Sequence, residues 1–184
     1  KNKNYDKIIK KVIFMDRFIT ETKTVRFDEA LELDCGKTLK EFEVAYETYG
    51  ELNDNKDNCI LLLHALTGNA HAAGYHEGDK KAGWWNDMVG SGKAFDSDKY
   101  FIVCSNMLGG CSGTTGPNST NPDTGKPYGL EFPVITFEDA VRVQKRLIDY
   151  LGVKKLIVAG GSMGGMQAIE WSVSYPEMVK KTIV

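Results

Sequence analysis

The sequence predicts one α/β domain built on a mostly parallel sheet, with antiparallel strands at its N-terminal side. Two observations favour this fold class: short apolar runs alternate with helical patterns, and Gly and Pro cluster between these segments without forming a linker. With 184 residues and 42% hydrophobic content, the chain can bury a sizeable core. We find no internal repeat, so we expect a basic tail over residues 1–20 and one core domain over residues 21–184.

The predicted strands are of two kinds. Residues 39–46 (LKEFEVAY) alternate apolar and polar side chains, as in a half-buried antiparallel strand near a sheet edge, and residues 25–33 show a weaker form of this pattern. The later runs are continuously apolar, which is typical of strands covered on both faces. They are residues 59–63 (CILLL), 100–104 (YFIVC) and 156–159 (LIVA), and they are candidates for parallel strands.

A helix is predicted over residues 137–151, where Ala140, Val143, Leu147 and Leu151 recur at helical spacing. Thr136 can cap its N-terminus with acidic support from Asp139, and Gly152 can end it. Helix and strands therefore alternate as they do in parallel α/β domains.

The last two elements predict an incomplete sheet. A second helix should run from Met163 to about Tyr175, where Pro176 stops it, and residues 181–184 (KTIV) should begin another strand. A parallel sheet that ended there would leave an unpaired edge and would lack a helix over one face. We therefore expect the C-terminal part of the domain to be missing.

Charge and composition exclude several functions. A formal net charge of −2 gives no overall basic balance, so nucleic acid is not an expected partner. No apolar run approaches the roughly 18 residues of a membrane span, and Val12 to Met15 is too short for a signal-peptide core. The four cysteines form no CxxC pair and are expected to be reduced. We expect a cytoplasmic protein.

Residues 160–164 carry the strongest chemical signal, a G-x-S-x-G motif between an apolar run and a predicted helix. In this context a sharp strand-to-helix turn holds the serine in a strained conformation and exposes its hydroxyl, while Gly160 and Gly164 remove side chains that would collide. A tightly packed or phosphate-cradling turn is the alternative, but the Lys-Ser or Lys-Thr ending of a P-loop is absent. Ser162 is therefore the predicted catalytic nucleophile.

Two backbone N–H groups are candidates for an oxyanion hole. Met163 should lie at a helix N-terminus beside the serine, and Leu66 lies in the loop LHALTG after an earlier strand, where Gly68 would permit a close approach. We interpret His64 as a packed histidine that orients this loop. The Gly-rich segment 106–116 should reach the same end of the sheet, where such loops build sites in open α/β sheets, although a simple turn is the alternative.

A general base is missing from the expected place. In the fold that uses this motif the order along the chain is Ser, then Asp or Glu, then His, but the three histidines, His64, His71 and His76, all precede Ser162. An upstream base, loss of catalysis or an incomplete chain would each account for this, and the incomplete sheet favours the last. His71 and His76 are five residues apart without an HExxH arrangement or cysteine pairs, so no metal site is predicted.

Several blocks in the same order resemble the homoserine O-acetyltransferase family of the α/β-hydrolase superfamily. The resemblance covers roughly residues 40–184, except that Ser91 stands where the family usually has Pro. The blocks are LLLHALTGNAHAAG (61–74), GWWNDMVGSGKAFD (83–96), the segment from NMLGGCSGTTG to FEDAVRVQ (106–144) and GGSMGGMQAIEW (160–171).

The resemblance implies acyl transfer from acetyl-CoA to L-homoserine in methionine biosynthesis, with acetyl-CoA as a substrate and no bound cofactor. It places the nucleophile on Ser162 and the oxyanion donors on the backbone of Leu66 and Met163. It also implies a homodimer, a helical lid and a triad Asp and His beyond residue 184. Succinyl-CoA as donor, serine as acceptor, a simple esterase or thioesterase, and a catalytically inactive relic stay open as alternatives.

Overall fold

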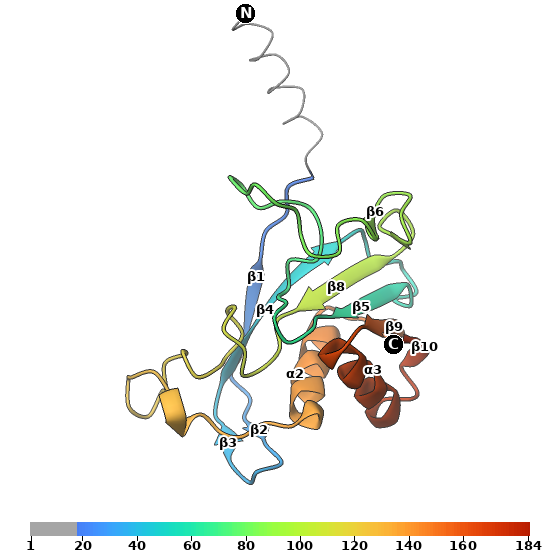
Figure 1. Cartoon of the computed structure of the whole chain (residues 1–184). Coiled ribbons are helices and arrows are strands. Elements are labelled where there is room, and N and C mark those ends of the chain that lie inside the picture. Colours follow the sequence, from blue (N-terminus) through green and yellow to red (C-terminus); the bar gives the residue numbers. More distant parts are fainter. Residues whose placement is uncertain (1–17) are drawn as a thin grey trace, which may run out of the picture.

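A computed structural model describes residues 18–184, so most of the predicted tail lies outside the described residues. A six-stranded sheet forms the centre, and two helices lie together against one of its faces (Figure 1). Its strands are β1 (Lys23–Phe27), β4 (Phe42–Tyr49), β5 (Cys59–Leu63), β8 (Phe101–Ser105), β9 (Leu156–Gly160) and β10 (Val179–Ile183). The remaining elements are the short strands β2 (Leu31–Glu32), β3 (Thr38–Leu39), β6 (Val89–Gly90) and β7 (Phe95–Asp96), the 3₁₀ turn η1 (Gly129–Glu131), and the helices α2 (Phe137–Tyr150) and α3 (Met163–Ser174).

The sheet has the order β1-β4-β8-β5-β9-β10. β1 and β4 pair antiparallel, β4 pairs antiparallel with β8, and the pairs from β8 to β10 are parallel. The predicted class, a mostly parallel sheet with antiparallel N-terminal strands, is confirmed. The three continuous apolar runs coincide with β5, β8 and β9 to within a residue or two at each end.

The N-terminal strands differ from their predicted bounds. The strand expected over residues 39–46 begins at Phe42, and the segment expected over residues 25–33 divides into β1 and β2. The reason is tertiary: Thr38 and Leu39 leave the alternating run to pair with Leu31 and Glu32 in a separate hairpin. This hairpin buries Leu31 and Leu39, which stabilises it despite the interrupted strand.

The prediction of a half-buried strand is wrong for β4. This strand is the second of the sheet, between β1 and β8, and four consecutive residues from Val44 to Glu47 are all buried. Loops cover its outer face: a Cβ added to Gly113 would lie 2.9 Å from the Cβ of Ala45, and the loop after β5 packs over Glu47. Alternation in the sequence therefore reported polarity and not exposure.

Both predicted helices are confirmed. Thr136 caps α2 with a complete capping box, in which its side chain accepts from the Asp139 N–H and the Asp139 carboxylate accepts from the Thr136 N–H. Gly152, with φ 76°, follows the helix in the left-handed region that favours glycine. α3 begins directly after Ser162 and ends before Pro176.

Two apolar clusters cover the two faces of the sheet. One lies between the sheet and the two helices, and its largest fully buried side chain is Trp171 of α3. The other lies beneath the long segment between β5 and β8, where Ala72, Ala73 and Phe95 pack on Ile60 and Ile102. This covering explains why β5 and β8 are almost entirely apolar.

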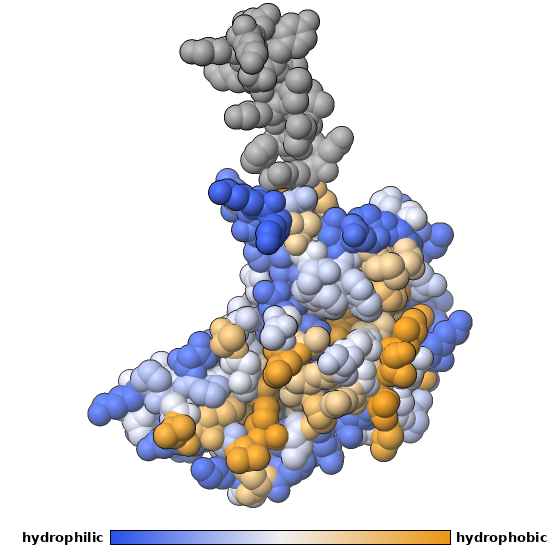
Figure 2. All heavy atoms as spheres, in the orientation of Figure 1, coloured by the Kyte–Doolittle hydropathy of each residue, from blue (hydrophilic) through white to orange (hydrophobic). Residues whose placement is uncertain are grey.

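The C-terminal side of the sheet carries exposed apolar side chains. β10 is exposed over most of its length at the edge next to β9, and α3 exposes Met166, Ile169 and Val173. Figure 2 shows hydrophobic side chains gathered over this region of the surface. Among residues 18–184, no helix has the length and apolar character that a membrane crossing requires.

The first described residues lie against the body of the protein. The N–H of Thr20 donates to the Tyr75 carbonyl at 2.9 Å, and the N–H of Tyr75 donates to the Phe18 carbonyl at 2.9 Å. Residues 18–20 of the predicted tail thus pair with the long loop that follows β5.

Candidate active site

Ser162 lies at the sharp turn between β9 and α3. Its backbone has φ 56° and ψ −128°, a conformation that non-glycine residues rarely adopt. The side chain is exposed and makes no capping hydrogen bond to the helix that it precedes. The turn therefore presents the hydroxyl at the carboxyl end of β9, where ligands bind in open α/β sheets.

The glycines of the motif have unequal roles. A Cβ on Gly164 would lie 1.9 Å from the Leu63 carbonyl oxygen, and one on Gly160 would lie 2.6 Å from the same atom. A Cβ on Gly161 would meet nothing within 4 Å. The end of β5 thus packs directly on the elbow, and Gly160 and Gly164 are the two positions that permit this contact.

The two predicted oxyanion donors border one pocket. Leu66, Gly68 and Met163 line a cavity of about 200 Å³ together with His64, Ile135 and the segment 106–112. Within residues 18–184, the backbone N–H groups of Leu66 and Met163 donate to no other group. Both N–H groups are thus available to a ligand. Gly68 is required by packing, since a Cβ there would lie 2.8 Å from the Cβ of His64.

His64 holds the loop that carries Leu66. Its Nδ1 is 2.8 Å from the Ala65 carbonyl oxygen and its Nε2 accepts from the Met107 N–H at 3.1 Å, so Nδ1 carries the proton of the neutral ring. Burial lowers the pKa of His64, and the hydrogen bond to Ala65 opposes this only partly. With both nitrogens engaged, the ring has no free lone pair to accept a proton from Ser162.

Asn106 connects the Gly-rich loop to the oxyanion loop. This buried side chain accepts from the Ala70 N–H at 2.7 Å and donates to the Ser112 carbonyl, while the Thr114 hydroxyl donates to the Asn106 carbonyl at 2.8 Å. The segment predicted only as a possible site loop is thereby fixed as one wall of the pocket.

A buried chain of amides joins the two helices to the oxyanion loop. Trp171 donates to Gln144 at 2.7 Å, Gln144 donates to Gln167 at 2.6 Å, and Gln167 reaches the His64 carbonyl at 3.4 Å. The sequence patterns did not reveal these residues. The available signal was polarity in an apolar place, because Gln144 lies between Val143 and Leu147 on the buried face of α2.

Comparison with known proteins agrees with this geometry. The family described as alpha/beta hydrolase fold matches residues 58–184, which include β5, the elbow and both sides of the pocket. The chain belongs to the α/β-hydrolase fold family. Within that family, Ser162 occupies the turn between strand and helix at which these proteins place a nucleophile.

The similar α/β-hydrolase proteins include several homoserine O-acetyltransferases. The chain is 62% identical over 164 residues to that of Methanohalobium evestigatum and 63% identical over 161 residues to that of Deferribacter desulfuricans. These matches cover 89% and 86% of the chain but only 34% and 43% of the relatives. The chain thus spans between a third and a half of the length of these curated relatives.

Solved structures of two functional kinds resemble this α/β-hydrolase chain. Homoserine O-acetyltransferase from Bacillus anthracis has a TM-score of 0.85 at 39% identity, with 90% of the chain and 46% of that structure covered. Esterase E22 has a TM-score of 0.82 at 44% identity, with 88% and 46% covered. The fold is therefore shared by a transferase and an esterase.

His71 and His76 lie away from the pocket lining, in a cluster with Glu47 of β4. His71 Nδ1 is 3.1 Å from one carboxylate oxygen of Glu47, and His76 Nε2 is 2.7 Å from the other. The prediction of no metal site considered only the spacing of the two histidines in the sequence. The fold of this α/β-hydrolase supplies a third donor from a residue 24 positions before His71.

Proposed function

We propose that this chain is the N-terminal part of a homoserine O-acetyltransferase, which transfers acetyl from acetyl-CoA to the hydroxyl of L-homoserine through an acyl-enzyme on Ser162. The observation that carries the proposal is the strained, exposed Ser162 beside a pocket with two available N–H groups. The relatives named homoserine O-acetyltransferase, at 57% to 63% identity, support the choice of substrates.

The geometry suits acyl transfer in two steps. In the first, Ser162 Oγ forms a bond to the thioester carbon, its proton passes to a base, and the carbonyl oxygen becomes an oxyanion that the N–H groups of Leu66 and Met163 can receive. Collapse of this intermediate breaks the carbon–sulfur bond and releases CoA, which takes up the proton. In the second step the homoserine hydroxyl gives its proton to the base and its oxygen bonds to the acyl carbon. The bond from that carbon to Ser162 Oγ breaks, Oγ takes back the proton, and the acetyl ester of homoserine leaves.

The base is not supplied by the histidines of this chain in their observed positions. His64 uses both ring nitrogens, while His71 and His76 face Glu47. Part of the proposal is therefore that the triad Asp and His come from residues after Val184, in the order that the α/β-hydrolase fold uses.

The test is intact-mass spectrometry of the full-length gene product after brief exposure to acetyl-CoA. We expect wild type to gain one acetyl group and Ser162→Ala to gain none, because only the hydroxyl of Ser162 can form the ester. An acetyl group that persists in Ser162→Ala, or its absence from both proteins, would contradict the proposal.

An esterase is the second candidate, favoured by the 44% identity to esterase E22. Water would then take the place of homoserine in the second step. CoA release from acetyl-CoA separates the two functions: a transferase should release CoA faster when homoserine is added, whereas a hydrolase should release it at the same rate with or without homoserine. Parallel reactions with succinyl-CoA and with serine identify the acyl donor and acceptor.

A role in methionine biosynthesis, a homodimer and a cytoplasmic location belong to the same proposal. Methionine auxotrophy after deletion of the gene would support the first. Light scattering of the purified full-length protein tests the second, since a dimer should have twice the mass of the polypeptide, and fractionation of cells tests the third.

A further inference from the structure

We propose that Glu47, His71 and His76 form a binding site for one divalent transition-metal ion of the Zn²⁺ class. One donor atom from each of the three residues lies within 4.8 Å of the other two. Two imidazoles and one carboxylate are a donor set that Zn²⁺ and related ions use in proteins. The site is separate from Ser162 and does not depend on the proposed function.

The spacing of the donors is close to what a tetrahedral ion needs. Metal–ligand bonds of about 2.1 Å imply donor–donor separations of about 3.4 Å. His71 Nδ1 and His76 Nε2 are 3.1 Å and 2.7 Å from the two Glu47 oxygens. These two contacts would have to lengthen by about 0.3 Å and about 0.7 Å to match that separation.

Charge also favours a cation at this position. The Glu47 side chain is fully buried, and within residues 18–184 no Lys or Arg forms an ion pair with it. The two imidazole rings lie with their centroids 4.0 Å apart, and both face the same carboxylate. One dication bound between them and Glu47 would neutralise the buried carboxylate.

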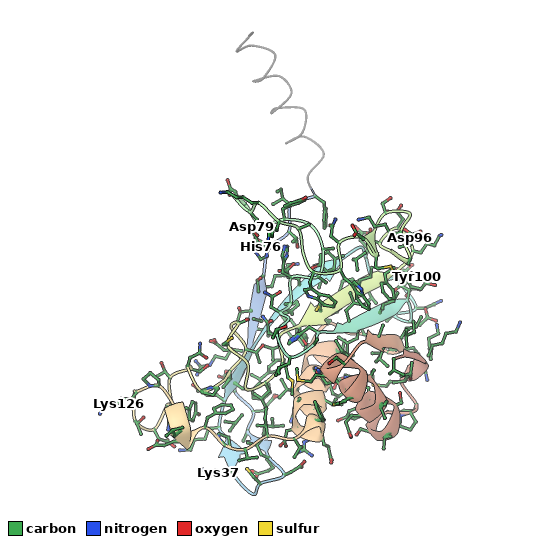
Figure 3. The ribbon with its side chains drawn as sticks, in the orientation of Figure 1. Lys37, His76, Asp79, Asp96, Tyr100 and Lys126 are labelled. Atoms are coloured by element: carbon green, nitrogen blue, oxygen red, sulfur yellow. The ribbon has the colours of Figure 1, made fainter. Side chains whose placement is uncertain are left out.

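The surrounding groups would hold the metal ligands in place. Thr22 and Tyr49 donate to the Glu47 carboxylate at 3.0 Å and 2.8 Å, which fixes its orientation. His76 Nδ1 is 3.7 Å from an Asp79 oxygen, and the two residues lie together near the end of the sheet where β1 begins (Figure 3). A carboxylate behind a ligating histidine commonly orients the ring in metal sites.

The cluster can be reached from solvent on one side. Within residues 18–184, His71 Nε2 is buried and has no hydrogen-bond partner, but it lies on the side of the ring away from Glu47 and is not one of the proposed ligand atoms. His76 is about one-third exposed, so an ion can enter from solvent on that side.

The ion would fasten the loop after β5 to the sheet. His71 and His76 both follow Leu66 and Gly68 in this loop, while Glu47 belongs to β4. Tyr49 already ties the same loop to β4, because its hydroxyl accepts from the N–H groups of Ala72 and Ala73 at 2.9 Å and 3.1 Å. A bound metal ion would add coordinate bonds between this loop and β4.

The test is calorimetric titration of the full-length gene product with Zn²⁺ after chelator treatment. Exposed thiols also bind zinc, so the titration uses a Cys35→Ser, Cys111→Ser background. We expect one Zn²⁺ per chain, and binding of Co²⁺ with visible absorption bands. His76→Ala and Glu47→Gln should weaken binding at least about tenfold, whereas the neighbouring exposed carboxylate variant Glu77→Gln should not.

Folding of each variant is checked by circular dichroism. If the buried Glu47→Gln protein does not fold, His76→Ala decides, because His76 lies on a partly exposed loop. As a second readout, Zn²⁺ should raise the melting temperature of the background protein but not that of His76→Ala. Absence of Zn²⁺ and Co²⁺ binding, or an unchanged Zn²⁺ affinity in His76→Ala, would contradict the proposed metal site. The three residues would then only hold the loop to β4 by hydrogen bonds.

Discussion

At the scale of single residues, the contact between Gly164 and the end of β5 leaves no room for a side chain at position 164. Gly164→Ala should destabilise the protein by about 3 kcal/mol or more, since overpacking against rigid backbone costs at least as much as overpacking among side chains. Here the added Cβ would meet the Leu63 carbonyl oxygen at 1.9 Å. Urea unfolding measures the loss.

Gly161 supplies the matched control. Gly161→Ala should be neutral or should stabilise by up to about 1 kcal/mol, because its Cβ meets nothing and alanine restricts the unfolded chain. Equal stability of the two alanine variants would show that the close approach of β5 to the elbow is wrong.

The backbone strain at Ser162 predicts an unusual order of stabilities. A Cβ in this region of φ and ψ costs about 1–3 kcal/mol, whereas glycine loses about 0.5–1 kcal/mol through unfolded-state entropy. Ser162→Gly should therefore be more stable than Ser162→Ala by about 1 kcal/mol, although both lack the nucleophile. Thermal unfolding of the two inactive variants makes the comparison, and a less stable Ser162→Gly protein would argue against strain at φ 56°.

Burial of His64 predicts a pH dependence of stability. Because the folded-state pKa is lowered, the unfolded chain binds a proton first as pH falls below the ordinary value of about 6.5. The free energy of unfolding should therefore decrease as pH falls from about 7.5 to about 5.5. His64→Asn should lose part of this dependence in urea unfolding at the two pH values, whereas an unchanged slope would mean that other groups cause it.

At the scale of secondary-structure elements, the amide chain between α2 and α3 is the feature most open to a test. Gln144→Leu leaves Trp171 Nε1 and Gln167 Oε1 buried without their partner. Each unpaired group costs about 1–3 kcal/mol, so the variant should lose about 2–6 kcal/mol in chemical denaturation. Arg146→Gln, at a partly exposed position of the same helix, should change stability by less than about 0.5 kcal/mol.

At the scale of the whole molecule, the exposed apolar side chains of α3 and β10 suggest that further residues cover this face. Residues 1–184 alone should bind a hydrophobic dye strongly and should show negligible acetyl transfer, since His64, the histidine that lines the pocket, has both ring nitrogens engaged. The full-length gene product should bind little dye and should transfer acetyl groups. Dye fluorescence and CoA release measure the two properties, and robust transfer by residues 1–184 would refute the expectation.

The substitution Val173→Lys tests whether further residues cover the apolar face of α3 and β10. Val173 is 71% exposed on α3, so Val173→Lys should be tolerated in residues 1–184. In the full-length protein it should lower the melting temperature, because it would place a charge in a covered apolar contact. Equal tolerance in the two proteins would mean that this face stays open to solvent.

Features that depend on local chemistry could be predicted from the sequence alone. Continuous apolar runs predicted β5, β8 and β9, the Thr136 and Asp139 pair predicted the start of α2, and the motif at residues 160–164 predicted a turn between strand and helix. Each of these signals arises within about fifteen residues of chain, where periodicity, capping and glycine content act directly.

Packing of the whole chain determines which distant residues meet. Burial of β4, the hydrogen bonds that fix His64 and the encounter of Glu47 with His71 and His76 all depend on loops packing across the sheet. Alternation along a strand reports polarity, but it does not report which face other segments cover. The amide chain of Gln144 and Gln167 was missed for the same reason, since a polar side chain shows its partner only after the helices are packed.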